Sequence, residues 1–144
     1  MSKYFRIPDN IQEMIDKMLV IDMDNIESQI ETNIANEAFI GKLLYETNDL
    51  LIEHEIRRDE KARELRIKYI TGNTEEKDIS DIRFNRTELD TAINGNREML
   101  VLNQKIKELE NMVSYYERVL HNIRSKNFAL RDIINWRKFQ HGII

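Results

Sequence analysis

Basic residues gather in one short stretch of the chain, with a spacing that suits contact with phosphate. Residues 57–68 hold six cationic and three acidic side chains, a formal charge of +3. On a helix, Arg57, Lys61 and Lys68 share a face that Glu64 interrupts, and Arg66 lies on another side. Since phosphate contacts respond to local potential, the stretch is a candidate nucleic-acid contact. Its candidate residues are Arg57, Arg58, Lys61, Arg63, Arg66 and Lys68. The alternative is a solvated helix whose charges pair along its surface.

A second basic stretch lies near the carboxyl terminus. If the helix is continuous there, Arg124, Arg131 and Lys138 are seven residues apart and form one stripe. Basic surfaces with aromatic rings suit single-stranded nucleic acid, whose exposed bases stack on the rings. The alternative is that the rings belong to a bundle core and the cations surround it. Three aromatic residues interleave with the stripe: Phe128, Trp136 and Phe139.

Nucleotide hydrolysis is not expected from this sequence. A phosphate-binding loop needs a glycine, four residues, and then Gly-Lys-Ser/Thr. Gly41-Lys42 is followed by Leu43, and Asn36 stands where the first glycine should be. The chain therefore lacks the loop with which such enzymes hold ATP.

Metal and cofactor chemistry are not expected either. No cysteine is present, which excludes thiolate ligands and cysteine nucleophiles. The histidines have neither zinc spacing nor the Glu-x-x-His spacing of a di-iron bundle. We therefore predict a protein that is not an enzyme and that has no metal or cofactor. The three histidines are His54, His121 and His141.

Composition favours long helices in a single small protein. The 144 residues include 4 Gly and 1 Pro, too few for a turn-rich β-sandwich. No apolar run approaches the length of a membrane span, and the amino terminus lacks the apolar core of a signal peptide. The default expectation is a soluble, intracellular, mostly helical protein with no membrane contact. The net charge is −4, and residues 1–56 alone carry −8.

Two helices are predicted in the amino-terminal half. A short one begins after Pro8, with Asp9 or Asn10 as its cap, and a longer one begins after a cap at Asp22 or Asp24. The longer helix meets no proline before residue 70, and residues 47–49 are its weakest point. Unbroken, it would reach roughly 65–70 Å, whereas a compact globule of this length is about 35–40 Å across. It therefore needs a partner helix.

The carboxyl-terminal segment has the most regular pattern. Apolar residues follow alternating steps of three and four from Met99 onward, with Asn127 at one core-type position. A second apolar set beside them indicates a helix with more than one partner. We therefore predict an all-α fold, a long helical hairpin that assembles into a homo-oligomer. The residues predicted to carry assembly are Leu102, Ile106, Leu109, Val113, Tyr116, Leu120, Ile123, Leu130, Ile134 and Trp136.

The sequence divides into three predicted regions. Residues 1–72 form a helical region with an acidic start and a basic end, which closes at Thr71-Gly72-Asn73. Residues 73–97 form a polar connection with a short helical turn at residues 86–89. Residues 98–144 form the helical oligomerisation region.

Several stretches together resemble the UvsY-like recombination mediators of T4-like bacteriophages. The chain opening, IQE at 11–13 and VID at 20–22, is similar to the family's first helix and cap. RIKYITG at 66–72 resembles the family's basic helix end before a turn. The most specific match is IRSKNFAL at 123–130, followed by WRKF at 136–139 and Gly142.

The resemblance implies a function without catalysis. Such proteins bind single-stranded DNA, weaken the hold of the phage single-strand-binding protein, and help a RecA-like recombinase of the UvsX type to form its filament. They work as ring-like homo-oligomers, hexamers or heptamers, in the cytoplasm of the infected bacterial host. The alternative is a helical scaffold or adaptor without affinity for nucleic acid.

The resemblance also implies a DNA contact at a Lys-x-Arg pair before the turn. Arg66 matches the arginine, whereas Glu64 stands at the lysine position. Lys61, Arg63 and Lys68 are the alternatives for the missing charge. The carboxyl-terminal candidates for the same strand are Arg124, Arg131 and Lys138.

Overall fold

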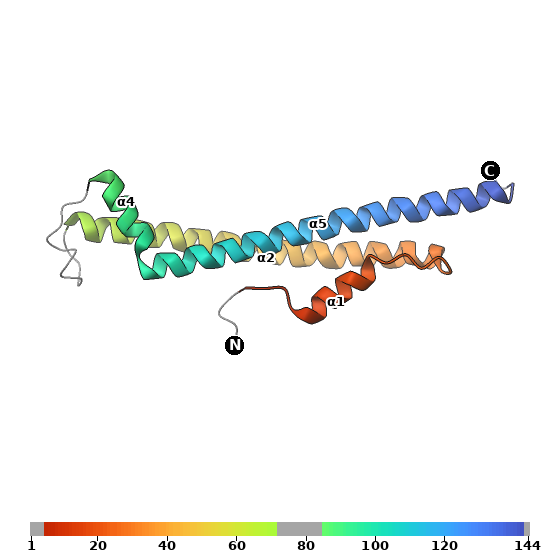
Figure 1. The fold of residues 1–144 in the computed structure, drawn as a ribbon, viewed down its shortest axis with the longest axis horizontal. Helices are drawn as coiled ribbons and strands as arrows, with labels where there is room; N and C mark the ends of the chain where they lie inside the picture. Colours follow the sequence, from red (N-terminus) through yellow and green to blue (C-terminus); the bar gives the residue numbers. More distant parts are fainter. Residues whose placement is uncertain (1–4, 72–84, 143–144) are drawn as a thin grey trace. The chain divides into compact units, whose positions relative to one another are not determined.

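The computed structural model describes residues 5–71 and 85–142 of the chain. Its helices, in chain order, are α1 (Asp9–Met18), α2 (Ile26–Thr71), α4 (Arg86–Gly95) and α5 (Arg97–Gln140). Figure 1 traces them from red α1 through orange and yellow α2 and green α4 to blue α5. The described residues contain no strand, and the predicted all-α fold is confirmed.

The start of α1 is set by Pro8. The carbonyl of Pro8 accepts the N–H groups of Ile11 and Gln12 at 3.0 and 3.1 Å, and no side chain caps the helix. The predicted cap at Asp9 or Asn10 is therefore wrong, because both residues lie inside the first turn. Proline fixes its own φ near the helical value, here −58°, which makes it a natural boundary.

A polar turn precedes α2. The Asp22 carboxylate accepts from the backbone N–H of Asp24 at 2.9 Å and from the Asn25 amide at 3.1 Å. The hydrogen bond from Asp24 is the main reason that the pKa of Asp22 is lowered. The Gln29 side chain makes two hydrogen bonds to the backbone of Asp22: its Oε1 accepts the Asp22 N–H, and its Nε2 donates to the Asp22 carbonyl. Asp22 and Gln29 thus close the turn, but the predicted cap at Asp22 or Asp24 is wrong, because α2 begins at Ile26 and the Asn25 carbonyl accepts its first helical bond, from the Gln29 N–H at 3.2 Å.

Helix α2 runs unbroken through its predicted weak point. Thr47 lies inside it and donates its hydroxyl to the Leu43 carbonyl at 2.7 Å, so the polar side chain has its hydrogen-bond partner within the helix. The helix ends at Thr71. The rest of the predicted stop, Gly72-Asn73, lies outside the described residues.

The chain divides into two compact units that share both long helices. Within the described residues, unit 1 comprises Phe5, residues 49–71 and residues 85–110. Unit 2 comprises residues 6–48 and 111–142. Each unit therefore holds one part of α2 and one part of α5.

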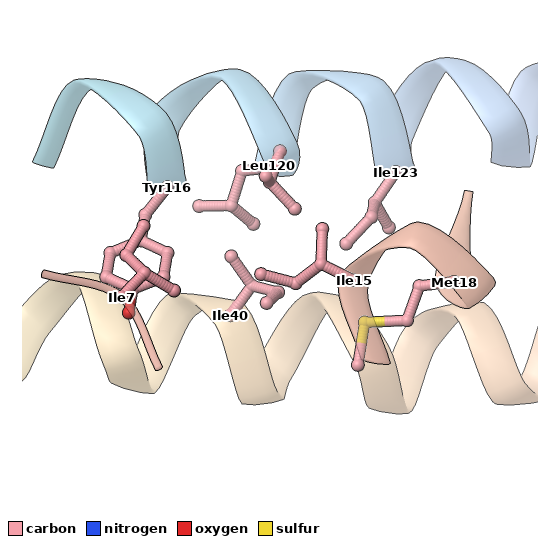
Figure 2. Packing of buried hydrophobic residues seen from close by; sticks show 8 residues of the cluster. Ile7, Ile15, Met18, Ile40, Tyr116, Leu120 and Ile123 are labelled. Atoms are coloured by element: carbon pink, nitrogen blue, oxygen red, sulfur yellow. The ribbon is translucent and has the colours of Figure 1, made fainter. Parts of the chain in front are cut away.

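The core of unit 2 is built by three helices. Figure 2 shows Tyr116, Leu120 and Ile123 of α5 directed toward α2, with Ile40 of α2 and Ile15 of α1 between the two long helices. Ile7, Met18 and Val119 complete the buried cluster. Each such side chain contributes about 1.5–3 kcal/mol when it leaves water, so α1 stabilises the helix pair.

One buried side-chain amide helps to set how α2 and α5 align in unit 2. Asn33 is 2% exposed, and its Nδ2 donates to the Ile123 carbonyl at 2.8 Å. Its Oδ1, and that of Asn127 one turn beyond Ile123, have no hydrogen-bond partner among the described residues. If α2 and α5 were shifted along each other, the Asn33 Nδ2 would lose its acceptor, and a buried donor without a hydrogen bond destabilises the fold. The Asn33–Ile123 bond therefore favours this alignment.

Unit 1 is held together by a smaller cluster. Leu65 and Tyr69 of α2 pack with Leu89 and Ile93 of α4 and with Met99 of α5. The side chain of Asn85 accepts from the Glu88 N–H at 2.8 Å, and Glu88 bonds back to Asn85. This capping box starts a helix of 10 residues, longer than the predicted turn at 86–89.

We expect Met18→Ala to destabilise the protein by about 2–5 kcal/mol, because a long buried side chain leaves a cavity. Met23→Ala is the matched control and should change stability by no more than about 0.5 kcal/mol. Both methionines belong to unit 2, but Met18 is 9% exposed and Met23 53%. Denaturant unfolding followed by circular dichroism measures the difference, and equal losses would contradict the assigned core.

Candidate nucleic-acid interface

The basic stretch at residues 57–68 lies in the unit 1 part of α2. Leu65 and Tyr69 face the core of this unit, and they fix which sides of the helix remain at the surface. Arg57, Arg63, Arg66 and Lys68 are exposed, and Arg58 and Lys61 are half-buried. All six predicted cations are therefore on surface faces of one helix, on more than one side of it.

Acidic residues from other helices hold two of these cations. Arg66 contacts Asp90 of α4 at 2.8 Å, and Lys61 contacts Glu98 of α5 at 2.7 Å. The bond to Glu98 is the main reason that the pKa of Lys61 is raised. Both contacts join α2 to its neighbours in unit 1, so these cations also support the fold.

Acidic residues of α2 itself hold three more of the predicted cations. Glu64 lies 3.4 Å from Lys68 and 3.5 Å from Lys61. The hydrogen bond from Lys68 and then the charge of Lys61 lower the pKa of the Glu64 carboxyl. Arg57 contacts Glu53 at 2.6 Å, and Arg58 contacts Asp59 at 3.3 Å. Exposed ion pairs of this kind are weak, so a phosphate could compete for the cations.

Arg63 differs from the other five cations. It is exposed, and among the described residues it has no acidic side chain within ion-pair distance. Its guanidinium can meet a phosphate without first leaving a partner. Arg63 is therefore the strongest single candidate in the stretch.

The carboxyl-terminal cations belong to unit 2 and fall into two groups. Arg124 contacts Glu37 of α2 at 2.8 Å. Lys126 donates to the Met18 carbonyl and Arg137 to the Met23 carbonyl, at 2.7 and 2.8 Å. Burial lowers the pKa of the Lys126 amine. These three side chains tie α5 to the rest of unit 2.

Arg131 and Lys138 form the second group. Both are exposed, and neither has an ion-pair partner among the described residues. They lie seven residues apart on α5, which places them on one side of the helix. Of the predicted stripe, they are the two members that remain available to a ligand.

The three aromatic residues of this segment lie outside the core of unit 2. Phe128 is 66% exposed, and Trp136 and Phe139 are each 60% exposed. The Trp136 and Phe139 rings stack with their centroids 5.8 Å apart and their planes 19° apart. These rings are therefore not buried within the single chain, and the bundle-core alternative would require a second copy.

With the exception of Trp136, the residues predicted to carry assembly are buried or half-buried within the single chain. Leu102, Val113 and Ile134 are half-buried, and of the set Trp136 alone is exposed. The heptad stripe of α5 is thus used inside each unit, against the chain's own helices. The buried members are Ile106, Leu109, Tyr116, Leu120, Ile123 and Leu130.

Two other kinds of site are absent from the described ranges, 5–71 and 85–142. There, no three His, Asp or Glu side chains come together as a metal site would require. In the same ranges, no helix is both long and apolar enough to cross a membrane.

Comparison with protein families gives a match over most of the chain. The family described as "Recombination, repair and ssDNA binding protein UvsY" matches residues 14–143. The chain belongs to the UvsY family. The predicted resemblance is therefore confirmed, and it places the chain among recombination and repair proteins that bind single-stranded DNA. No curated protein matches the sequence.

Solved structures share the fold. Two crystal structures of the bacteriophage T4 recombination mediator protein UvsY, in lattice types II and I, match with TM-scores of 0.81 and 0.80. Each is 17% identical to this chain. The first match covers 95% of this chain and 99% of the other, and the second covers 92% and 99%. At this identity the likeness establishes a common fold of the UvsY type.

Sequence reasoning missed the acids that hold the predicted cations. Glu37, Asp90 and Glu98 were not singled out, yet they pair with Arg124, Arg66 and Lys61. Two of these contacts span 24 and 87 residues. Helical spacing reveals partners three or four residues apart, so no local signal could have identified them.

We expect Glu64→Lys to strengthen binding to single-stranded DNA and to steepen its salt dependence. The change frees Lys68 and adds a second cation at position 64, whereas Lys61 keeps its contact with Glu98. If both reach phosphates, the slope of log K against log salt grows by about 1.4, since each contact adds about 0.7. Fluorescence anisotropy of a labelled oligonucleotide at several salt concentrations measures both quantities.

The matched control is Glu31→Lys, which makes the same charge change at an exposed site in the unit 2 part of α2. It should raise affinity less and leave the slope nearly unchanged. Equal effects of the two variants would mean that net charge, and not the basic stretch, governs binding.

Proposed function

We propose that this chain is a recombination mediator of phage homologous recombination. It binds single-stranded DNA, helps to displace the phage single-strand-binding protein, and promotes filament formation by a RecA-like recombinase of the UvsX type. It works in the cytoplasm of the infected host and hydrolyses no ATP itself. The observation that carries the proposal is the family match over residues 14–143.

The proposed DNA contacts combine both basic stretches. In unit 1 they are Arg57, Arg58, Lys61, Arg63, Arg66 and Lys68, and in unit 2 Arg124, Arg131 and Lys138. The unpaired Arg63, Arg131 and Lys138 make the first phosphate contacts, and cations in weak surface pairs exchange their acids for phosphates afterwards. Binding of this kind depends on salt and tolerates any base sequence.

We further propose that the protein acts as a ring-like homo-oligomer, a hexamer or heptamer. One subunit offers few free cations, each worth little against screening salt. A ring repeats the set, so contacts to one strand add through effective concentration. Such an assembly can keep hold of the strand while the strand-binding protein leaves.

The proposal predicts a shorter lag before a RecA-like recombinase hydrolyses ATP on single-stranded DNA coated with the strand-binding protein. Arg63→Ala combined with Arg66→Ala should weaken DNA binding and lengthen this lag toward its value without the mediator. The lag is read from the ATP-hydrolysis time course, and DNA binding from anisotropy.

Arg86→Ala combined with Arg97→Ala is the control for charge. Both arginines are exposed in unit 1 and lie outside the proposed contacts, so this variant should keep the lag short. If the unaltered protein binds DNA but never changes the lag, the mediator role is wrong. If it shows no salt-dependent binding to single-stranded DNA, the scaffold alternative replaces the proposal.

A second experiment separates folding from assembly along α5. Leu120→Lys combined with Ile123→Lys should abolish the helical structure of unit 2, because unpaired charge in a core is costly. His121→Lys combined with Asn122→Lys makes the same additions at exposed neighbours and should leave the helix content intact. Circular dichroism and mass in solution are measured together. A Leu120/Ile123 variant that keeps full helicity and loses only mass would show that the stripe serves assembly.

A further inference from the structure

The carboxyl-terminal end of α5 carries a shallow hollow that none of the contacts above uses. It has a volume of about 350 Å³ and is lined by Asp132, Asn135, Trp136 and Phe139. The four residues are spaced by three, one and three along the helix, so they share one face. The stacked rings of Trp136 and Phe139 supply its apolar wall.

The polar side chains of the hollow indicate what can occupy it. The Asp132 carboxylate only accepts hydrogen bonds, whereas the Asn135 amide both donates and accepts. A phosphate would meet the negative charge of Asp132. A nucleobase instead offers N–H groups and carbonyl oxygens at its edge and a flat face for the rings, and stacking on aromatic side chains tolerates any base.

The surroundings of the hollow supply the contacts to phosphate. Arg131 and Lys138 lie on the neighbouring side of α5, and both are exposed without an ion-pair partner among the described residues. Phe128 extends the aromatic face toward the amino end of the helix, four residues before Asp132, and is also exposed. A strand along α5 would thus meet cations on one side and rings on the other.

A second copy of the same surface fits this face less well. Two such faces together would bring the unpaired Arg131 and Lys138 of both copies close to one another. They would also bury the Asp132 charge against rings, and an unpaired buried charge is costly. A nucleic-acid strand carries the opposite charge to Arg131 and Lys138, and its bases offer hydrogen-bond donors to the Asp132 carboxylate.

We propose that this hollow is a base-stacking site for single-stranded DNA, in which Trp136 and Phe139 receive a nucleobase while Arg131 and Lys138 hold the adjacent phosphates. The inference rests on the proposed single-stranded DNA function and assigns Trp136 to the strand instead of to assembly. The DNA contacts proposed above depend on the charge of the phosphates, whereas the contact in this hollow depends on the bases.

The chain contains a single tryptophan, so intrinsic tryptophan emission reports on this hollow alone. Titration of the unaltered protein with oligothymidylate should quench the emission. An abasic oligonucleotide of equal length keeps the phosphates and lacks the bases, so it should bind more weakly and leave the emission nearly unchanged. Anisotropy of a labelled strand measures binding of both oligonucleotides independently of the tryptophan.

Phe139→Ala should weaken oligothymidylate binding at least about fivefold, the lower range for loss of one aromatic–base contact, and should not weaken abasic binding. Trp136→Ala should do the same, and Trp136→Phe should restore most of the affinity. The matched control is Tyr45→Ala, which removes an exposed ring of α2 in the same unit and should change neither affinity. Mass in solution is measured for every variant.

The outcomes separate this inference from the proposed function. Binding of oligothymidylate with unchanged tryptophan emission would overturn the base-stacking site and leave the DNA-binding function intact. Emission that changes on dilution of the protein alone, and not with DNA, would assign the rings to contact between copies and also overturn the site. Absence of any strand binding by anisotropy would remove the proposed function itself.

Discussion

The apolar stripe of α5 has to be covered, and the way in which the chain covers it determines the rest of the structure. A 44-residue helix with a heptad stripe cannot stay in water with that stripe exposed. In unit 2 the stripe packs on α2 and is completed by α1, and in unit 1 the start of α5 joins α2 and α4. The remaining faces of α2 and α5 are thereby fixed as surface, and all the candidate cations lie on these faces.

The same packing determines which charges are free. Once α2, α4 and α5 are joined in unit 1, Asp90 and Glu98 meet Arg66 and Lys61. A stretch with a formal charge of +3 is then largely paired, and Arg63 remains without an acid among the residues described. In unit 2, Arg124, Lys126 and Arg137 bind their own chain, which leaves Arg131 and Lys138 to a ligand. Charge summed over a stretch is thus a poor measure of what the stretch offers to DNA, because packing supplies the counter-charges.

A shared fold at 17% identity with the T4 protein is understandable from this constraint. What the helices require is an apolar residue of suitable size at each stripe position and a polar one elsewhere, and many sequences meet that requirement. Surface positions are less constrained by packing. Position 64 is one example, since the Glu64 side chain is exposed and pairs with Lys68 at the surface.

The amino-acid sequence by itself determined the helical class, the stripe with Asn127 in it, and the family, and it left open whether α2 and α5 are each continuous. These features depend on periodicity, on the scarcity of proline and on residue order, which can all be read locally. Tertiary structure alone decided that the stripe faces the chain's own helices, that Phe128, Trp136 and Phe139 stay exposed, and which acids hold which cations. Those outcomes depend on contacts between residues as far apart as Glu37 and Arg124. Helical periodicity shows which residues share a face, but the partner that covers the face is chosen only when the helices pack.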